Sequence, residues 1–228
     1  MIKLTIIIPV YNEIKTIEKL IKKILRINIR KQLIIVDDGS NDGTELILIK
    51  YKNKINKLIT HKKNLGKGAA IKSGQKYVKG KYIGIQDADL EYDPRDLKKI
   101  VNEMEKKNLK VMYGSRVLKK NKFKNTQSFT HIIRIWGNIF LTKVSNFLNR
   151  QKLTDAHTCY KVFDSNIFKK IKLKEKGFSF CPEITTKISL MNMNIQEFPI
   201  NYIGRTYDEG KKITAFDGLD ALYVLAKY

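Results

Sequence analysis

Two aspartates, Asp87 and Asp89, flank a single alanine directly after a short apolar run, in the stretch IQDADLEYDP at 85–94. Like charges this close repel one another unless a cation lies between them. Carboxylates at this spacing in a loop can share one Mg²⁺ or Mn²⁺, and the same ion can bind the oxygens of a diphosphate. The alternative interpretation is an acidic loop that caps the next helix, a role that fits Asp93-Pro94. The sequence assigns no role to Glu91 in the same stretch.

Two further polar stretches carry residues suited to a nucleotide. Asp37 and Asp38 end an apolar run, and a carboxylate at such a position can accept hydrogen bonds from a ribose or a base. The stretch NLGKG at 64–68 places glycines and Lys67 where a helix should begin, which suits a diphosphate. The chain contains neither a Walker A loop nor a Gly-x-Gly-x-x-Gly fingerprint, so a kinase or a dehydrogenase is not indicated.

Composition predicts a protein with one sizeable domain, because 43% of its 228 residues are apolar. The 45 Lys and Arg against 22 Asp and Glu give a net charge of +23. Only seven of the basic residues are Arg, and the lysines are scattered along the whole chain. A basic surface can attract nucleic acid, but no helix-turn-helix, RNP or zinc pattern supports a nucleic-acid-binding protein. Cys159 and Cys181 are expected to be buried free thiols.

No stretch of ~20 apolar residues is free of charge, and the N-terminus has no signal-peptide pattern. The sequence therefore predicts a cytoplasmic protein. Peripheral contact with the cytoplasmic face of the membrane stays open because 129–148 is rich in Ile, Phe, Leu and Trp. This segment is either a helix of the core or of a dimer interface, or an amphipathic helix that rests on a bilayer.

The order of apolar and amphipathic runs predicts an α/β fold. Strands are expected at Leu4–Val10, Leu33–Val36, Ile55–His61, Tyr82–Ile85 and Val111–Tyr113. Helices are expected at Ile14–Leu25, from about Thr44, from Gly66–Gly68 to about Val78, and at Arg95–Lys106 behind Asp93-Pro94. Further along, helices are expected at Phe129–Leu148, from Pro182 and at Phe216–Tyr228, with a strand at Ile195–Ile203. This rhythm is typical of a mostly parallel sheet with helices on both faces, whose ligands bind beyond the carboxyl ends of the strands.

Five motifs occur in a fixed order: PVYNE at 9–13, DDGS at 37–40, NLGKG at 64–68, QDAD at 86–89 and GSR at 114–116. Together they resemble the family 2 glycosyltransferases of GT-A fold. Within that family they resemble the branch of dolichyl- or polyprenyl-phosphate sugar synthases, which includes the dolichyl-phosphate mannose synthases. The resemblance runs from residue 4 to about 215. It implies one GT-A domain over 1–228, with a nucleotide-sugar-binding half at 1–116 and an acceptor-side half at 117–228.

The resemblance also implies roles for individual residues. On the donor side, the nucleoside would be held by Pro9, Tyr11, Glu13 and Asp38, and the metal on the diphosphate by Asp87 and Asp89 with Gln86 nearby. On the acceptor side, Arg116 would face the acceptor phosphate with help from Arg134, while Glu183 would lie near the sugar. Arg205 and Lys211 resemble the family's late basic element, which closes over phosphates.

The acceptor is left open at the sequence level, since 154–161 (TDAHTCYK) departs from the Gly-Phe-Arg version usual in that branch. A lipid phosphate is already ionised and would need only cationic positioning. A saccharide hydroxyl would need a carboxylate base, for which Asp155 and Glu183 are the candidates. The expected donor is GDP-mannose or a UDP-hexose. A sugar nucleotidyltransferase could share the sheet, but the glycine-rich first loop expected of one is missing.

Overall fold

The computed structural model describes residues 1–118, 129–205 and 215–228, without the side chains at 129–134 and 215. One sheet of seven strands runs through the described residues in the order β3-β2-β1-β4-β6-β5-β7. The strands are β1 (Leu4–Val10), β2 (Lys31–Asp37), β3 (Lys57–Thr60), β4 (Tyr82–Ile85), β5 (Val111–Ser115), β6 (Lys161–Asp164) and β7 (Gln196–Pro199). The helices are α1 (Ile17–Leu25), α2 (Thr44–Lys50), α3 (Lys67–Gln75), α4 (Arg95–Lys106), α5 (Phe129–Asn149), α6 (Ser165–Lys170), α7 (Phe180–Leu190) and α8 (Ala215–Lys227), with a 3₁₀ turn at Lys52–Lys54.

The sheet is mostly parallel, as predicted. β1 pairs in parallel with β2 and β4, β2 with β3, and β5 with β7. β6 is the exception, because it lies antiparallel between β4 and β5. The sequence analysis missed β6 and α6, since a four-residue strand that leads directly into a six-residue helix shows no clear period.

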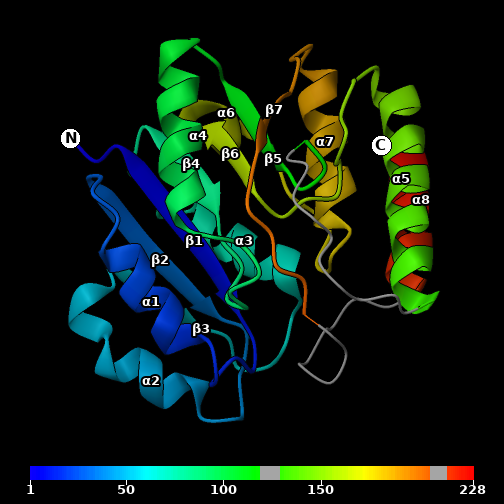
Figure 1. Cartoon of the computed structure of the whole chain (residues 1–228). Coiled ribbons are helices and arrows are strands. Elements are labelled where there is room, and N and C mark those ends of the chain that lie inside the picture. The colour runs from blue at the N-terminus through cyan, green and yellow to red at the C-terminus, as the bar shows by residue number, and fades with distance from the viewer. Residues whose placement is uncertain (119–128, 206–214) are drawn as a thin grey trace.

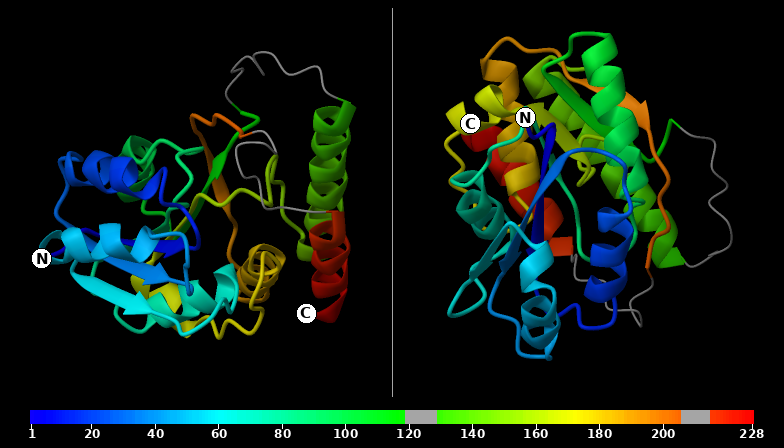
Figure 2. Two further views of the ribbon diagram at one scale, coloured as in Figure 1. Left: turned by 90° about the horizontal axis from the view of Figure 1, so that it is seen from below. Right: turned by 90° about the vertical axis from the view of Figure 1, so that its left-hand side faces the viewer.

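Helices cover both faces of the sheet, as the views in Figures 1 and 2 show. On one face α1 and α4 bury apolar residues such as Leu20, Ile24 and Met104 against β1 and β4. On the other face α3 and α7 do the same with residues such as Ile71 and Ile184. Removing one such buried side chain costs about 2–5 kcal/mol of stability. This two-faced core fixes the strands whose ends carry the polar loops.

Three helices of the second half, α5, α7 and α8, pack on one another. Figure 1 shows them together at one side of the molecule, with α7 nearest to the sheet. Among the described residues no helix is long and apolar enough to cross a membrane.

Several element boundaries differ from those predicted. The first helix begins at Ile17, because the residues before it form a turn in which Asn12 has φ 51° and the Ile14 N–H donates to Asp42. The helix predicted from Pro182 begins at Phe180, and the strand predicted over 195–203 is limited to β7. Side-chain hydrogen bonds from loops decide such ends, and the hydrophobic period does not record them.

The start of α4 also differs in detail. The helix begins at Arg95, so Pro94 precedes it instead of occupying its first position. Asp93 Oδ1 accepts a hydrogen bond from the backbone N–H of Arg95 at 3.0 Å, and its carboxylate also pairs with the Arg95 guanidinium. The predicted N-cap role of Asp93 is therefore wrong by one residue, because Pro94 is the N-cap, and the Asp93 side chain binds the first residue of α4.

We expect Gly66→Ala to destabilise the protein, because Gly66 has φ +97° and an added Cβ would lie 2.4 Å from the carbonyl oxygen of Lys176. Backbone strain of this kind costs about 1–3 kcal/mol. The free energy of unfolding from urea titrations measures the effect. Gly177→Ala is the matched control, since a Cβ there meets nothing within 4 Å. Equal unfolding midpoints for the two variants would contradict the prediction.

Candidate active site

The polar loops that follow β1, β2 and β4 meet at the carboxyl edge of the sheet. β1 pairs with β2 and with β4 in parallel register, which sets Val10 beside Asp37 and Ile7 beside Ile85. The loop after β1 is fastened to the loop after β2, because the N–H of Glu13 donates to Thr44 Oγ1 at 2.9 Å. Pro9 lies within β1 and Tyr11 directly after it, both partly buried.

Asp38 organises the glycine loop that precedes α3. Its buried carboxylate accepts hydrogen bonds from the N–H groups of Leu65 at 3.0 Å and Gly66 at 2.7 Å, and lies 2.6 Å from His61 Nδ1. The sequence analysis missed His61. Within the part of the chain that the structure describes, Oδ2 of the neighbouring Asp37 is buried without a hydrogen-bond partner. The Asp38 carboxylate, predicted to contact a nucleoside, thus already binds the glycine loop and His61.

Lys67 lies at the first position of α3 and points to the carboxylate pair. Its Nζ forms an ion pair with Asp87 and donates to Cys159 Sγ at 3.0 Å. Burial lowers the pKa of Lys67, but Asp87, Cys159 and Cys181 together raise it more, so the net shift is upward. Lys67 is therefore a fixed cation. Cys159 and Cys181 are free and buried, as predicted.

Asp89 lies in a cluster of carboxylates around Arg205. The guanidinium of Arg205 is 3.3 Å from Asp89 Oδ2, 3.2 Å from Glu13 Oε2 and 3.6 Å from Glu91 Oε1. Burial and the like charges of Asp87 and Glu91 raise the pKa of Asp89 to about 7, against the attraction of Arg205. The carboxylate is thus held where negative charge is only partly compensated.

This geometry fits a divalent cation that is shared with a diphosphate. Among the residues described, no group of three or more His, Cys, Asp or Glu side chains is arranged to hold a metal by itself. Asp87 and Asp89 supply two carboxylates, and the raised pKa of Asp89 reflects burial and the repulsion of Asp87 and Glu91, which a divalent cation would offset. Gln86 is fully buried, accepts a hydrogen bond from Tyr160 and donates to the Asp87 carbonyl, so it supports the loop from behind.

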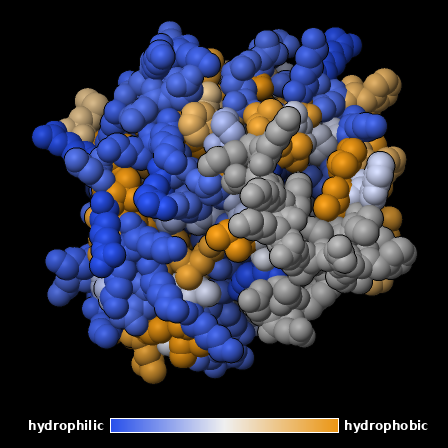
Figure 3. Space-filling model, viewed as in Figure 1, coloured by the Kyte–Doolittle hydropathy of each residue, from blue (hydrophilic) through white to orange (hydrophobic). Residues whose placement is uncertain are grey.

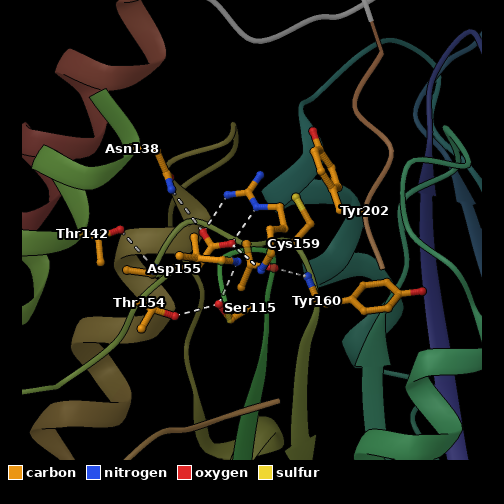
Figure 4. Close-up of polar contacts among 12 residues, drawn as sticks. Ser115, Asn138, Thr142, Thr154, Asp155, Cys159, Tyr160 and Tyr202 are labelled. Carbon is orange, nitrogen blue, oxygen red and sulfur yellow. Dashed lines mark hydrogen bonds and ion pairs between the residues drawn. The ribbon is translucent and has the colours of Figure 1, made fainter. Parts of the chain in front are cut away.

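Arg116, directly after β5, forms a bidentate pair with the buried Asp155. Arg116 Nε and Nη2 donate to Asp155 at 2.6 and 2.7 Å, and its backbone N–H donates at 3.1 Å. Figure 4 shows Asp155 in the middle of this polar network, with Asn138 on α5 directed at it. Burial raises the pKa of Asp155, but Arg116 outweighs burial and the pKa is lowered. The Arg116 side chain stays 21% exposed and lies over the Tyr202 ring at 5.2 Å.

Glu183 is not brought to the carboxylate cluster. Its fully buried carboxylate accepts the N–H groups of Lys174 at 2.6 Å and Glu175 at 3.0 Å, and pairs with Lys187. These bonds stabilise the loop before α7. Arg134 lies on α5 with a side chain outside the described residues, and Lys211 lies outside them altogether.

Of the predicted site residues, the structure brings together Glu13, Lys67, Asp87, Asp89 and Arg205. The sequence analysis missed three tyrosines that contact one another beside this cluster. The ring centroid of Tyr92 lies 4.7 Å from that of Tyr160, with the rings stacked, and 5.1 Å from that of Tyr202. Tyr160 directly precedes β6 and Tyr202 follows β7, and nothing in their distance along the chain from Tyr92 indicates that the three rings meet.

A sequence model described as "Glycosyl transferase family 2" matches residues 5–172, about three quarters of the chain. The chain belongs to this family. It is a glycosyltransferase, and the resemblance read from the motifs is confirmed.

Relatives of this family 2 member include a dodecaprenyl-phosphate galacturonate synthase of Rhizobium johnstonii, 27% identical over 79% of this chain and 53% of that protein. The chain thus spans about half the length of that relative. A UDP-N-acetylglucosamine–dolichyl-phosphate N-acetylglucosaminyltransferase of Methanococcus voltae is 28% identical over 96% of this chain and 93% of its own. A dolichyl-phosphate beta-glucosyltransferase of Dictyostelium discoideum is 29% identical over 94% and 70%.

Solved structures share the fold. S. aureus TarS 1–349 in complex with UDP-GlcNAc has a TM-score of 0.66 at 18% identity, over 99% of this chain and 66% of that one. Glucosyl-3-phosphoglycerate synthase from Mycobacterium tuberculosis, with Mn²⁺, UDP-glucose and phosphoglyceric acid, has a TM-score of 0.70 at 14% identity, over 99% and 79%. The GT-A fold predicted from the motifs is therefore confirmed.

The raised pKa of Asp89 gives a prediction for stability in the absence of divalent cations. The pKa of Asp89 rises from 3.8 in the unfolded chain to about 7 in the folded one. The folded protein therefore binds this proton more tightly, and its free energy of unfolding falls as the pH rises between these two values. Asp89→Asn imitates the neutral carboxyl and keeps the oxygen that accepts the Glu91 N–H. We expect it to raise the free energy of unfolding at pH 8 by about 1–3 kcal/mol, with the gain shrinking toward pH 4.

Urea titrations at pH 4.5 and pH 8 with EDTA measure this difference. Asp93→Asn is a control for which the opposite change in stability is expected. Burial raises the pKa of Asp93, but Arg95 lowers it by more, so the net shift is downward. That variant should lose stability at pH 8. A gain for Asp89→Asn that is equal at both pH values would contradict the prediction.

Proposed function

We propose that this glycosyltransferase moves a sugar from a nucleotide-sugar to a polyprenyl or dolichyl phosphate, with inversion at the anomeric carbon and with Mg²⁺ or Mn²⁺. The relatives named above support the lipid-phosphate acceptor, since their names specify dodecaprenyl phosphate or dolichyl phosphate. The M. voltae name and the titles of the solved structures support a UDP-sugar, with GDP-mannose as the other donor class.

The observation that carries the proposal is the state of the two carboxylates that could serve a hydroxyl acceptor as a base. Asp155 is buried and bound by Arg116 in two places, and Glu183 is buried and bound by two backbone N–H groups and Lys187. Neither is placed to take a proton from a substrate. A phosphate acceptor arrives ionised and needs no base, so this site suits it better.

The residues of the chain would divide the work as follows. Pro9, Tyr11, Glu13 and Asp38 would hold the nucleoside at the ends of β1 and β2. Asp87 and Asp89 would hold the divalent cation, which when bound neutralises charge on the departing diphosphate. Without the divalent cation, Lys67 pairs with Asp87 and Arg205 pairs with Asp89. Once the divalent cation took over these carboxylates, both side chains would turn toward phosphate oxygens.

Arg116 would meet the acceptor phosphate on the opposite side of the sugar. Asp155 holds the guanidinium by its Nε and Nη2 groups, and the Tyr202 ring supports it from below. A side chain fixed in this way loses little entropy when it binds an anion. The acceptor oxygen would then attack the anomeric carbon from the face away from the diphosphate.

Incubation of the protein with Mn²⁺, polyprenyl phosphate and labelled UDP-glucose, UDP-N-acetylglucosamine or GDP-mannose tests the proposal. Label should pass into an organic extract with at least one donor. If no donor yields labelled lipid, the proposed acceptor is wrong. Label in a water-soluble saccharide instead would favour transfer to a hydroxyl.

We expect Asp89→Ala to lower metal-dependent turnover by at least about 100-fold while the protein stays folded. The physical reason is the loss of one of the two carboxylates available to the cation. Initial rates with Mn²⁺, together with circular dichroism, measure this. Asp93→Ala should keep its metal-dependent turnover, because Asp93 contacts Arg95 instead. Unchanged turnover in Asp89→Ala would refute the metal role.

Membrane contact would follow from a lipid acceptor, and we propose that α5 and α8 provide it. Trp136, Phe140 and Phe147 form an exposed stripe on α5, at 67%, 57% and 84% exposure, and Figure 3 shows apolar residues at the right-hand edge, where α5 lies. Phe216 and Tyr223 are exposed on the adjacent α8. No Asp or Glu occurs in 129–154, which contains four Lys and Arg. An apolar, basic face suits an anionic bilayer.

The double substitution Phe140→Ser and Phe147→Ser should reduce co-sedimentation with vesicles of anionic lipid by about tenfold or more, because two exposed aromatic contacts are lost. Leu46→Ser, on α2 and 72% exposed, is the control and should bind as the unchanged protein does. Size-exclusion chromatography separates the remaining alternative. If the double variant loses a dimer but keeps vesicle binding, the face is an interface between two copies.

A further inference from the structure

Glu91 is an acidic residue of the IQDADLEYDP stretch for which the reaction outlined above and the start of α4 leave no role. Its side chain is buried at 9% exposure. Oε1 accepts the backbone N–H of Arg205 at 2.8 Å, and Oε2 accepts the hydroxyl of Tyr202 at 2.8 Å. Its backbone carbonyl accepts the N–H of Ile203 at 2.9 Å. Glu91 therefore binds one returning segment, 202–205, at three points.

The segment bound by Glu91 carries the cation of the carboxylate cluster. Arg205 reaches Glu13 and Asp89 with its two terminal nitrogens, at 3.2 and 3.3 Å. The hydrogen bond from the Arg205 backbone to Glu91 fixes the point from which this side chain extends. Without that bond the backbone at Arg205 would be less restrained, and the guanidinium would occupy its position beside Glu13 and Asp89 less often.

The second oxygen of Glu91 acts on the acceptor side. It accepts the hydroxyl of Tyr202, whose ring meets Tyr92 at 5.1 Å and lies under Arg116 at 5.2 Å. Tyr92 and Tyr202 also form an isolated antiparallel bridge. One carboxylate thus fixes the backbone of Arg205 and the aromatic ring that supports Arg116.

Two other roles for Glu91 are less consistent with these contacts. Both of its oxygens already accept hydrogen bonds from the 202–205 segment, so a general base would first have to break them. As a ligand to a cation it would release the segment that it binds. The bonds are of the kind that orients another residue: two charge-assisted hydrogen bonds to groups fixed by the backbone or by packing.

We propose that Glu91 is a positioning residue that aims Arg205 at the diphosphate site. This inference rests on the proposed role of Arg205 as a phosphate ligand. Glu91 does not touch the substrate, and it acts by holding the 202–205 segment over the loop that carries Asp87 and Asp89. Its removal should therefore weaken the same step as removal of the Arg205 side chain, and by a smaller factor.

Amide hydrogen exchange on the full chain, followed by NMR, tests the tether without any substrate. Glu91→Ala should speed exchange at the Arg205 amide by about tenfold, which corresponds to a lost hydrogen bond of about 1.4 kcal/mol. Exchange at Ile203 should change less, because its acceptor is the backbone carbonyl at 91. Glu91→Gln keeps an oxygen acceptor and should stay closer to the unchanged protein. Equal protection of Arg205 in a folded Glu91→Ala variant would overturn the tether.

Tyr202→Phe is the matched control. It removes the hydroxyl that donates to Oε2 but leaves the Arg205 N–H bond to Oε1, so the Arg205 amide should stay protected. If Tyr202→Phe exposes the Arg205 amide as much as Glu91→Ala does, general loosening of the segment explains the result and the specific role of Glu91 falls.

A double-mutant cycle tests the functional part, with Mn²⁺ and the labelled donor that supports transfer. Arg205→Ala and Glu91→Ala should change the same kinetic parameter: if one raises the KM for the donor, so should the other, and likewise if one lowers kcat. The double variant should match Arg205→Ala alone, since Glu91 has nothing left to aim. If Glu91→Ala costs its full factor again in the Arg205→Ala background, Glu91 acts on its own and positioning is wrong.

A different result is expected if Arg205 is not a phosphate ligand. In that case Arg205→Ala would leave donor use unchanged, and the positioning role would fall with it even if the exchange data showed the tether. Loss of activity in Arg205→Ala with full activity in Glu91→Ala would overturn the positioning role alone.

Discussion

Charge balance among buried carboxylates is the constraint on which the rest of this site depends. Asp87, Asp89 and Glu91 lie within five residues of one loop, and Glu13 joins them from the end of β1. Such groups stay ionised in a poorly solvated place only if cations reach them. Among the residues that the structure describes, Lys67 and Arg205 pair with them, and the fold must deliver both to the carboxyl edge of the sheet.

The two cations are delivered in the same way, by a carboxylate that binds the backbone next to them. Asp38 accepts the N–H groups of Leu65 and Gly66 and so fixes the turn that precedes Lys67. Glu91 accepts the N–H of Arg205 itself. Because a backbone hydrogen bond fixes only the base of a long side chain, each cation is held at its backbone while its charged end pairs with the carboxylates.

The sequence predicts the features that depend on residues close together along the chain. The periods of the apolar runs place most strands and helices, and the order of the motifs gives the family and the carboxyl edge where Asp87 and Asp89 lie. The pairs that decide the electrostatics are remote in sequence: Glu91 and Arg205 are 114 residues apart, and Arg116 and Asp155 are 39 apart. Nothing in a single sequence indicates which carboxylate meets which arginine, so Arg116 and Asp155 were assigned separate roles.

Three tyrosines link the carboxylate loop to the segments around Arg116. Tyr92, in the loop of the carboxylates, is stacked on Tyr160 and meets Tyr202. Tyr160 donates to Gln86, which donates to the Asp87 carbonyl, while Tyr202 donates to Glu91 and lies under Arg116. A shift of the segments that carry Tyr160 and Tyr202 would therefore move the loop that carries Asp87 and Asp89. Packed aromatic rings transmit such shifts because they leave no space to absorb them.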